Sequence, residues 1–472
     1  MARQQENHPS VCITKTLSVL PKILHPQKIL SLSNLDRQCP LLMYLVFFYK
    51  PSFHENLPLN SVFKSLKSGL EETLSIWYPA AGRLSLTPND GKLNLWCNNS
   101  GAILVEAVSH VKISELGDLS HYNEFFDNLV YKPVFNGNFS DMPLVVAQVT
   151  RFGCGGYSIG IGTSHSLFDG QATYEFMSAW ASNSAIMKLK GGHETVKPVH
   201  ERGRLLVGNF QIQNGITKLP TNSNLATRAT AINHLYLLIK QAMIDQNNGA
   251  DGQLGVRKVS DMGNSLSYVF KSFHLSGAVI ESLKRQITGG ISSSCSSFEV
   301  VAAHLWKARI KALGLMKESM VCLQFSVDTR YKMVPPLPKG FSGNAYVLAS
   351  IALTAGQLEE ESHEAIVEKI KEAKTSVSSD YVNAYIEALD GPQANLPPLK
   401  ELTIVSDWTR MPFHKIEFLN KEAAYASPLV PPIPQVAYFM QNPSDFRGID
   451  VRIGLLPQTL DAFTQYFLNN AQ

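Results

Sequence analysis

Hydrophobic positions recur along this chain at two different spacings, which predict a mixture of helices and strands. Apolar residues lie three and four places apart over residues 62–77, the spacing of one helical face, whereas residues 41–49 form a dense apolar run of strand length. We expect the helix to end at Tyr78, because the following Pro79 disfavours helical backbone in the residue before it. Helical and strand-like segments then alternate irregularly, which predicts mixed α/β layers.

The first part of the chain contains several further segments of this kind. Residues 33–36 are expected to form a polar turn, and Pro88-Asn89-Asp90-Gly91 is expected to connect a pair of strands. Strand patterns cover residues 11–20, 93–96, 102–108, 143–152 and 157–162, and a helical pattern covers residues 172–180.

Residues 186–228 separate this part from a second α/β unit, because glycines and prolines interrupt every possible element there. We therefore expect an N-terminal domain at 1–185, a crossover linker at 186–228 and a C-terminal domain at 229–472. In the last of these, residues 246–264 are polar and are expected to form a loop. The other patterns predict strands at 267–275 and 321–327, and helices at 229–243, 277–287, 296–312, 359–375, 380–389 and 458–467.

Composition narrows the class of protein. With 472 residues the chain is long enough for two or three domains, and 44% hydrophobic and 17% charged residues are typical of a globular protein. The net charge of +3 gives no reason to expect nucleic acid or a membrane surface as a partner. Six scattered cysteines without a Cys-x-x-Cys pair argue against a zinc site and fit a reducing compartment. No apolar stretch has the length of a membrane span, so we expect a soluble, cytoplasmic protein without a metal.

One histidine is a candidate for acid–base chemistry. His165 follows the strand expected at 157–162, and among the 13 histidines only this one has an aspartate, Asp169, at the fourth following position. A histidine that leaves a strand can be held as a general base while the aspartate fixes its loop. Taken alone, these residues fit a histidine hydrogen-bonded at a strand end equally well.

A set of motifs spread over nearly the whole chain resembles the plant BAHD acyltransferases, which move an acyl group from coenzyme A to an alcohol or amine. The motifs are His165-x-x-x-Asp169-Gly170, Tyr78-Pro-Ala-Ala-Gly82-Arg83, Ser297-Phe298-Glu299 ahead of Leu305-Trp306, Asp328-x-Arg330 before Pro-Pro-Leu-Pro, and Gly343-Asn344. The resemblance implies two similarly built domains like those of chloramphenicol acetyltransferase, each a mixed sheet with flanking helices. It also implies a long crossover between them and a channel with the histidine at its centre.

The resemblance implies roles for several residues around this motif. His165 is expected to act as the base, and Asp169 is expected to have a structural role by pairing with Arg330, with Gly170 and Asp328 in support. An ordinary surface ion pair is the alternative for Arg330. Ser406 corresponds to a hydroxyl that donates to the oxygen of the tetrahedral intermediate, with a plain turn serine as the alternative.

The resemblance also implies where the donor binds. Lys284, Arg285, Ser296 and Ser297 lie in the region from which the family contacts coenzyme A, although the two cations fit a solvated helix face as well. Acyl-CoA is then a co-substrate and no cofactor is bound permanently. The expected partners are an acyl-CoA donor and an alcohol or amine acceptor, and the chain is expected to be a monomer.

One stretch departs from the family pattern. Where the family usually carries Asp-Phe-Gly-Trp-Gly, this chain has Glu417-Phe418-Leu419-Asn420-Lys421. Leucine tolerates positive φ poorly, so the turn is expected to run differently, and loss of the aromatic anchor is expected to loosen the packing. Relatives with eroded motifs act as non-catalytic partners of fatty-acid elongation, which leaves a catalytically silent chain as an alternative. A weaker similarity points to relatives implicated in acylating brassinosteroids.

Overall fold

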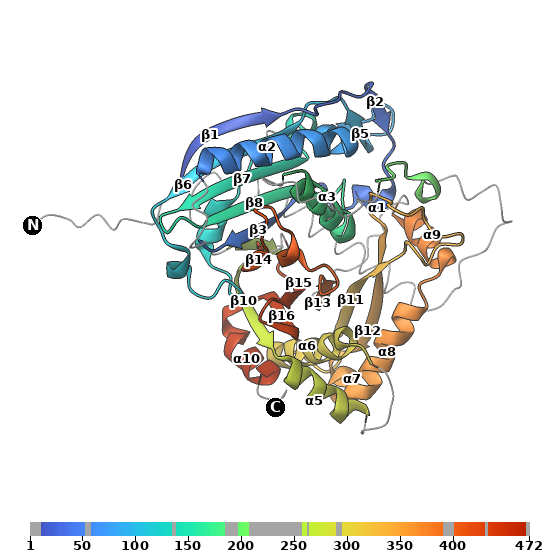
Figure 1. The fold of residues 1–472 in the computed structure, drawn as a ribbon. Helices are drawn as coiled ribbons and strands as arrows, with labels where there is room; N and C mark the ends of the chain where they lie inside the picture. The colour runs from blue at the N-terminus through green and yellow to red at the C-terminus, as the bar shows by residue number, and fades with distance from the viewer. Residues whose placement is uncertain are drawn as a thin grey trace, which may run out of the picture.

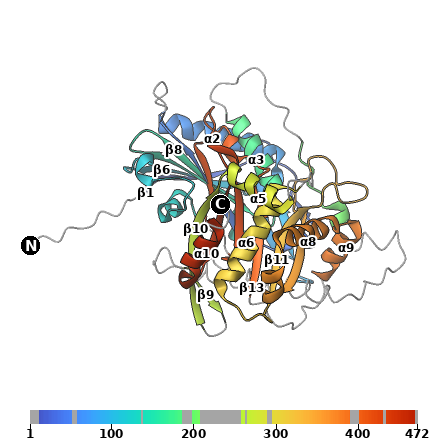
Figure 2. The same cartoon turned by 90° about the horizontal axis from the view of Figure 1, so that it is seen from below.

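The computed structural model describes residues 11–51, 58–134, 138–184, 197–206, 257–261, 264–288, 295–389, 401–429 and 433–468. Within these residues the chain folds into two halves, each built on a large mixed sheet with helices packed against it (Figures 1 and 2). The two largest hydrophobic clusters of the described residues lie one on each sheet. The expected α/β class with two sheet-based domains is therefore confirmed.

The first sheet carries the strand that leads to His165. Its strand order is β1-β6-β7-β8-β3-β14, and a small three-stranded sheet lies beside it in the order β2-β5-β4. Helices α2 and α3 pack on the large sheet and on each other, as Figure 1 shows in its upper half. The bounds are β1 (Val11–Val19), β2 (Lys28–Leu30), α1 (Asn34–Arg37), β3 (Leu42–Tyr49), α2 (Leu59–Ile76), β4 (Arg83–Leu86), β5 (Leu93–Cys97), β6 (Ala102–Ser109), β7 (Val145–Phe152), β8 (Tyr157–Ser164), α3 (Gly170–Asn183) and β14 (Tyr425–Pro428).

The second sheet has the strand order β12-β11-β13-β15-β16-β10-β9. Helix α6 lies in its core and is flanked by α5, α8 and α10 (Figure 2). The bounds are β9 (Arg257–Asp261), β10 (Asn264–Leu275), α5 (Gly277–Thr288), α6 (Ser297–Leu313), β11 (Met320–Asp328), β12 (Tyr346–Thr354), α7 (Ala355–Glu360), α8 (His363–Thr375), α9 (Ser379–Ala388), β13 (Glu401–Asp407), β15 (Val436–Asn442), β16 (Asp445–Leu455) and α10 (Leu460–Leu468). Short 3-10 turns are η1 (Tyr78–Ala81), η2 (Ile113–Leu116), η3 (Glu124–Leu129), η4 (Phe139–Asp141), η5 (Gly203–Leu205), η6 (Phe413–Lys415) and η7 (Pro457–Thr459).

Strand β14 connects the two halves, because it comes late in the chain but pairs with β3 in the first sheet. The altered motif leads into this strand and is tightly packed. Phe418 is 1% exposed and meets the rings of Phe47 and Trp180 edge-on, with centroids 5.5 and 5.1 Å away. The positive φ of 54° falls on Asn420, a residue type that tolerates it, while Leu419 is buried. Phe418, the phenylalanine shared with the family motif, is thus packed in the core, whereas Asn420 is exposed, and the loosening expected from the lost aromatic at that position stays a prediction.

Three local expectations were also wrong, and one strand was missed. The helix expected over 359–375 is two helices, because Ser362 caps a new start by accepting from the backbone N–H of Ala365. The loop expected at 246–264 includes β9, and β12 was missed. The turn expected at 33–36 opens the short helix α1, with Ser33 as its N-cap. Two of these differences arise from the capping serines at the starts of α1 and α8. Such caps accept hydrogen bonds from free backbone N–H groups, and hydrophobic spacing gives no information about them.

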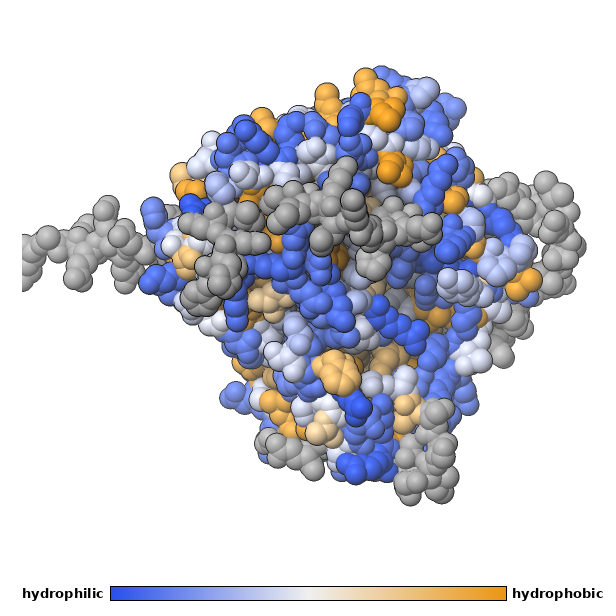
Figure 3. Space-filling model, viewed as in Figure 1, coloured by the Kyte–Doolittle hydropathy of each residue, from blue (hydrophilic) through white to orange (hydrophobic). Residues whose placement is uncertain are grey.

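The expected domains are continuous stretches of the chain. Strand β14 departs from this division, because it lies in the C-terminal stretch but belongs to the first sheet. Most of the linker at 186–228 and the helix expected at 229–243 lie outside the described residues. Within the described part of the chain, no helix combines the length and hydrophobicity that a bilayer crossing requires. The face drawn in Figure 3 is mostly hydrophilic, and its apolar residues lie in separate small groups.

Candidate active site

His165 lies at the point where β8 ends, in the loop that leads to α3. Its backbone N–H donates to the carbonyl of Leu41 at 2.9 Å, which continues the pairing between β8 and β3 by one residue. Leu167 and Phe168 then turn back onto the carbonyl of Ser164, and α3 begins five residues after His165, at Gly170. The imidazole is half-buried, whereas Phe168 packs into the first core against Trp77. The strand thus delivers a partly exposed imidazole, and Phe168 points into the core.

The side-chain amide of Asn344 fixes the orientation and the proton of the His165 ring. Its Nδ2 donates to two oxygens, the carbonyl of His165 at 2.7 Å and Oδ1 of Asp36 at 2.9 Å. These two acceptors define which amide atom is the oxygen, since a flipped amide would set its oxygen against both. The oxygen of Asn344 therefore accepts from Nδ1 of His165, at 3.1 Å. Neutral His165 then carries its proton on Nδ1, and Nε2 is the basic nitrogen.

Asp169 turns away from this imidazole and binds Arg330 of the other half. Both guanidinium nitrogens, Nη1 and Nη2, donate to the carboxylate at 2.9 Å. The same carboxylate accepts from the backbone N–H of Ala172, as the N-cap of α3, and from that of Ala345. Burial lowers the pKa of Arg330, but the Asp169 charge more than offsets it, so the net pKa is raised. The expected pair is therefore present, and it is a buried bidentate pair, not a surface contact.

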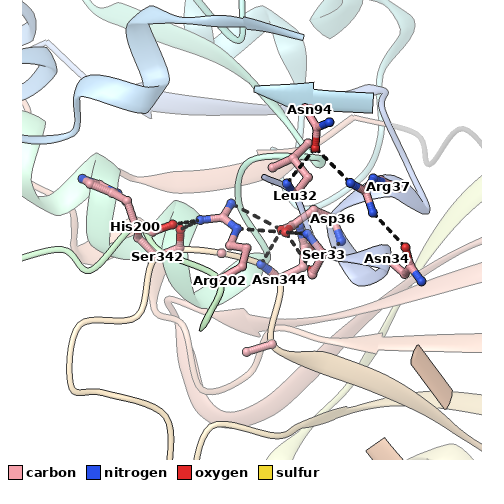
Figure 4. Close-up of polar contacts among 12 residues, drawn as sticks. Leu32, Ser33, Asn34, Asp36, Arg37, Asn94, His200, Arg202, Ser342 and Asn344 are labelled. Carbon is pink, nitrogen blue, oxygen red and sulfur yellow. Dashed lines mark hydrogen bonds and ion pairs between the residues drawn. The ribbon is translucent and has the colours of Figure 1, made fainter. Parts of the chain in front are cut away.

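A second buried ion pair, which the sequence analysis missed, lies behind Asn344 (Figure 4). Asp36 of α1 and Arg202 of the crossover segment are joined by a bond of 2.8 Å from Nε to Oδ2, and neither side chain is exposed. Burial raises the pKa of the Asp36 carboxyl, but the Arg202 charge and the hydrogen bonds from Arg202 and Asn344 lower it further, so the net pKa lies below its usual value. The available signal was the Ser33-x-x-Asp36 capping pattern at the start of α1.

Two of the supporting residues lie beside this centre. Asp328 ends β11 and accepts from the backbone N–H of Arg330 at 2.8 Å, which shapes the turn that carries the guanidinium. Gly170 faces the side chain of Met411, whose Cε would lie 2.9 Å from an added Cβ. Gly170 thus permits a close approach between α3 and a loop of the other half.

Ser406 lies on β13, and its Oγ accepts from the indole Nε1–H of Trp408 at 3.0 Å. Because this hydroxyl acts as an acceptor there, its own proton remains available to another group. Among the described residues, no hydrogen bond joins Ser406 to His165. Its role as an oxyanion donor stays a prediction.

The residues predicted to contact coenzyme A lie on α5 and at the start of α6. Lys284 forms an ion pair with Glu281 at 2.8 Å, and Nε of Arg285 donates to the carbonyl of the same residue. Ser296 is the N-cap of α6, forming a reciprocal capping box with Glu299, and Ser297 is the first helical residue. Helices α5 and α6 pack side by side, so the structure brings the four residues to neighbouring elements. Their role toward coenzyme A remains a prediction.

The buried thiols of the described residues are poor nucleophiles. Burial raises the pKa of Cys39 and of Cys97 to about 11, and that of Cys322 to about 12. A thiol with such a pKa stays protonated near neutral pH, and the thiolate is the reactive form. Among the described residues, no group of three or more His, Cys, Asp or Glu side chains is arranged to hold a metal ion.

A model of the transferase family matches residues 9–469 of the chain. The chain belongs to the BAHD acyltransferase family. One relative within it, brassinosteroid-related acyltransferase 1 of Arabidopsis thaliana, is 54% identical and covers 97% of this chain and 98% of its own length. Another Arabidopsis thaliana relative, omega-hydroxypalmitate O-feruloyl transferase, is 29% identical over 93% of this chain and 88% of its own length.

Solved structures agree on the fold. Vinorine synthase matches with a TM-score of 0.70 at 20% identity, covering 98% of both chains. F. sporotrichioides TRI101, complexed with coenzyme A and T-2, matches with a TM-score of 0.62 at 12% identity, covering 93% of this chain and 97% of its own. This BAHD chain is therefore an acyltransferase, and the alternative of a catalytically silent partner gains no support from its relatives.

Proposed function

We propose that this BAHD chain moves an acyl group from an acyl-CoA thioester to a hydroxyl or amine of a small-molecule acceptor, with His165 as general base. The observation that carries the proposal is the hydrogen bond from Nδ1 of His165 to the fixed amide oxygen of Asn344. It leaves Nε2 of a half-buried imidazole with a lone pair, which is what a base needs in order to accept a proton. The protein acts as a cytoplasmic monomer in this proposal.

The reaction follows from this protonation state. As the acceptor oxygen or nitrogen bonds to the thioester carbonyl carbon, its proton moves to Nε2 of His165. The tetrahedral intermediate then collapses, the carbon–sulfur bond breaks, and the coenzyme A thiolate takes the proton back from Nε2. Because a thioester is already activated, no covalent intermediate on the enzyme is required. The protonated state of the buried thiols, argued above, agrees with direct transfer.

The remaining site residues support these steps. The hydroxyl of Ser406, free to donate while it accepts from Trp408, stabilises the intermediate's negative oxygen. Asp169 takes no proton, because its carboxylate already accepts from Arg330 and from the backbone of Ala172 and Ala345. It holds the loop that carries His165.

Acyl-CoA is the donor in this proposal, as a co-substrate and not a resident cofactor. Coenzyme A is named as the bound ligand of F. sporotrichioides TRI101, which shares this fold. Lys284 and Arg285 on α5, with Ser296 and Ser297 at the start of α6, contact the phosphates of coenzyme A. Cations and a helix start are both suited to bind phosphate.

A brassinosteroid hydroxyl is the acceptor that the relatives favour. The relative with 54% identity over almost the full chain carries brassinosteroid-related acyltransferase in its name. The relatives near 29% identity are named for quite different acceptors, so identity at that level does not define the acceptor.

Product analysis tests the function. The purified chain is offered a panel of acyl-CoA donors with steroid, phenolic and amine acceptors, and products are identified by mass spectrometry. We expect an acylated steroid, and we expect His165→Ala to lose about two to four orders of magnitude in turnover while it stays folded. His121→Ala, which removes an exposed imidazole, is the matched control and should keep full turnover. Undiminished turnover in His165→Ala would disprove the mechanism, and absence of transfer from every acyl-CoA would disprove the donor.

A further inference from the structure

The ion pair between Asp36 and Arg202 is fully buried and is therefore not a surface contact. Asp36 is 0% exposed and Arg202 is 2% exposed, and they are separated by 166 positions in the chain. Burying two charges is costly unless they are paired and hydrogen-bonded on all sides, and such pairs are poor stabilisers compared with apolar residues of the same volume. Stability alone therefore does not account for this pair.

The surroundings of the pair are fully built. Asp36 accepts from the backbone and the hydroxyl of Ser33, and Arg202 donates to the carbonyls of His200 and Ser342. Glycine at position 343 is required by the same arrangement, since an added Cβ would lie 2.9 Å from Cζ of Arg202. As Figure 4 shows, these contacts bring α1, the crossover segment and the loop before β12 together at one point.

The pair ends at Asn344, which is the residue that holds His165. One carboxylate oxygen of Asp36 accepts both from the backbone N–H of Asn344, at 3.0 Å, and from its side-chain Nδ2, at 2.9 Å. Without this acceptor, one of the two bonds that define the amide orientation is lost. The amide could then rotate and present its NH₂ group to the imidazole, which would favour a proton on Nε2, the nitrogen that has to accept one.

We propose that Asp36 and Arg202 are positioning residues for the transfer reaction: the carboxylate of Asp36, balanced by Arg202, fixes the amide of Asn344 and thereby keeps Nε2 of His165 free of its proton. The assignment rests on His165 acting as the base, as proposed above. Arg202 provides the charge balance that lets the carboxylate stay buried. Because Arg202 lies on the crossover segment, the connection between the two halves itself takes part in ordering the base.

The test removes both charges together, so that no unpaired charge is left buried. In the variant Asp36→Ala/Arg202→Met, we expect kcat at saturating acyl-CoA and acceptor to fall by about tenfold to a hundredfold, because the base is misplaced. The KM for acyl-CoA should stay within about twofold, since neither side chain is exposed to a bound substrate. A purely structural role would not produce this split.

A second readout needs no substrate. Protein labelled with ¹⁵N-histidine reports by NMR which ring nitrogen carries the proton, and the difference from His165→Gln assigns the His165 signals. We expect a proton on Nδ1 in the wild type and a mixture of the two tautomers in the double variant. This readout separates the present inference from the proposed function, because it holds even if no acyl transfer is found.

The matched control is Arg452→Met, which removes another arginine with 0% exposure that bridges the halves through Ser120 and Ser427. It should lower stability but keep the wild-type kcat and tautomer. A folded double variant with wild-type kcat and tautomer would overturn the proposal, as would an equal loss of kcat in Arg452→Met. If the double variant does not fold, Asp36→Leu/Arg202→Met, which restores side-chain volume at position 36 and still removes the acceptor and both charges, is measured in the same way, and wild-type values there also overturn it.

Discussion

At the scale of single residues, the chemistry of the site depends on which polar atoms already form hydrogen bonds. Both Nδ2 hydrogens of Asn344 are used, so its oxygen faces His165, and the carboxylate of Asp169 is used by Arg330 and two backbone groups. Nε2 of His165 and the proton of Ser406, in contrast, keep unused hydrogen-bonding capacity. A proton acceptor and a proton donor are the two groups that thioester transfer requires.

Ser406 gives the first prediction. If its hydroxyl stabilises the oxyanion, Ser406→Ala should lower kcat by about a hundredfold to a thousandfold with little change in the KM of either substrate. Ser406→Thr keeps the hydroxyl and suits a strand, so it should recover most of the loss. Steady-state kinetics of the two variants check this, and equal turnover in wild type and Ser406→Ala would leave Ser406 as a plain strand serine.

The cations of α5 give the second prediction. Replacing Lys284 and Arg285 by Gln should raise the apparent KM for acyl-CoA much more than that for the acceptor, because only the donor carries phosphates. The effect should shrink as salt is added, since exposed charges are screened. Lys371→Gln, at another helix-surface cation paired with a nearby glutamate, is the control. Equal changes for both substrates would assign Lys284 and Arg285 to the solvated surface.

At the scale of elements, the sequence predicted the helices and strands that are determined by residues close together in the chain. Hydrophobic patterns correctly predicted β3, β8 and α2, the serine and glutamate three apart at Ser296 correctly predicted α6, and the His-x-x-x-Asp spacing selected the loop of His165. It could not predict that β14 joins the first sheet, because the pairing of Tyr425 with Phe48 depends on contacts between distant segments. It also missed Asp36 and Arg202, since the glycine-rich crossover carries no periodic pattern and the two residues meet only after folding.

The crossover segment gives a prediction for pH dependence. His200 packs under Trp77, donates from Nε2 to the carbonyl of Ile76 and accepts from the hydroxyl of Ser342. Burial lowers the pKa of His200 to about 4, although the hydrogen bond to Ile76 acts in the opposite direction. In the unfolded chain a histidine titrates near a pKa of about 6.5. At a pH between these two pKa values, the unfolded chain therefore binds a proton on His200 that the folded protein does not bind.

His200 therefore contributes to the free energy of unfolding, by up to about 3 kcal/mol. This contribution is fully present above a pH of about 6.5 and is lost as the pH falls toward about 4. The free energy of unfolding, measured with denaturant across this range, should fall less steeply in His200→Gln than in the wild type. His121→Gln, at an exposed position, should leave the slope as it is. Parallel pH profiles for wild type and His200→Gln would contradict the prediction.

At the scale of the whole molecule, buried arginines join the two halves around the active centre. Arg330 reaches Asp169 in the first half, Arg202 of the crossover reaches Asp36, and Arg452 on β16 donates to the carbonyl of Ser120. Arg330 and Arg202 also donate to the carbonyls of Gly343 and Ser342, so these two arginines hold the loop of Asn344 against the loop of His165. Arg452 and β14 join the halves away from this contact, so the geometry of the base depends on Arg330 and Arg202 in particular.

The Asp169–Arg330 pair allows this coupling to be measured. Both side chains are largely buried, at 7% and 11% exposure, so removing either one leaves the other charge unpaired. Each single alanine variant should cost about 3–5 kcal/mol of unfolding free energy, and the double variant should cost clearly less than the sum, because it leaves no unpaired charge. The more exposed pair Lys371–Glu368 serves as the control cycle, with a coupling energy expected below about 1 kcal/mol. Denaturant unfolding of the six variants gives both coupling energies. Strict additivity at Asp169 and Arg330 would mean that other contacts hold the halves together and that this pair does not order the loop of His165.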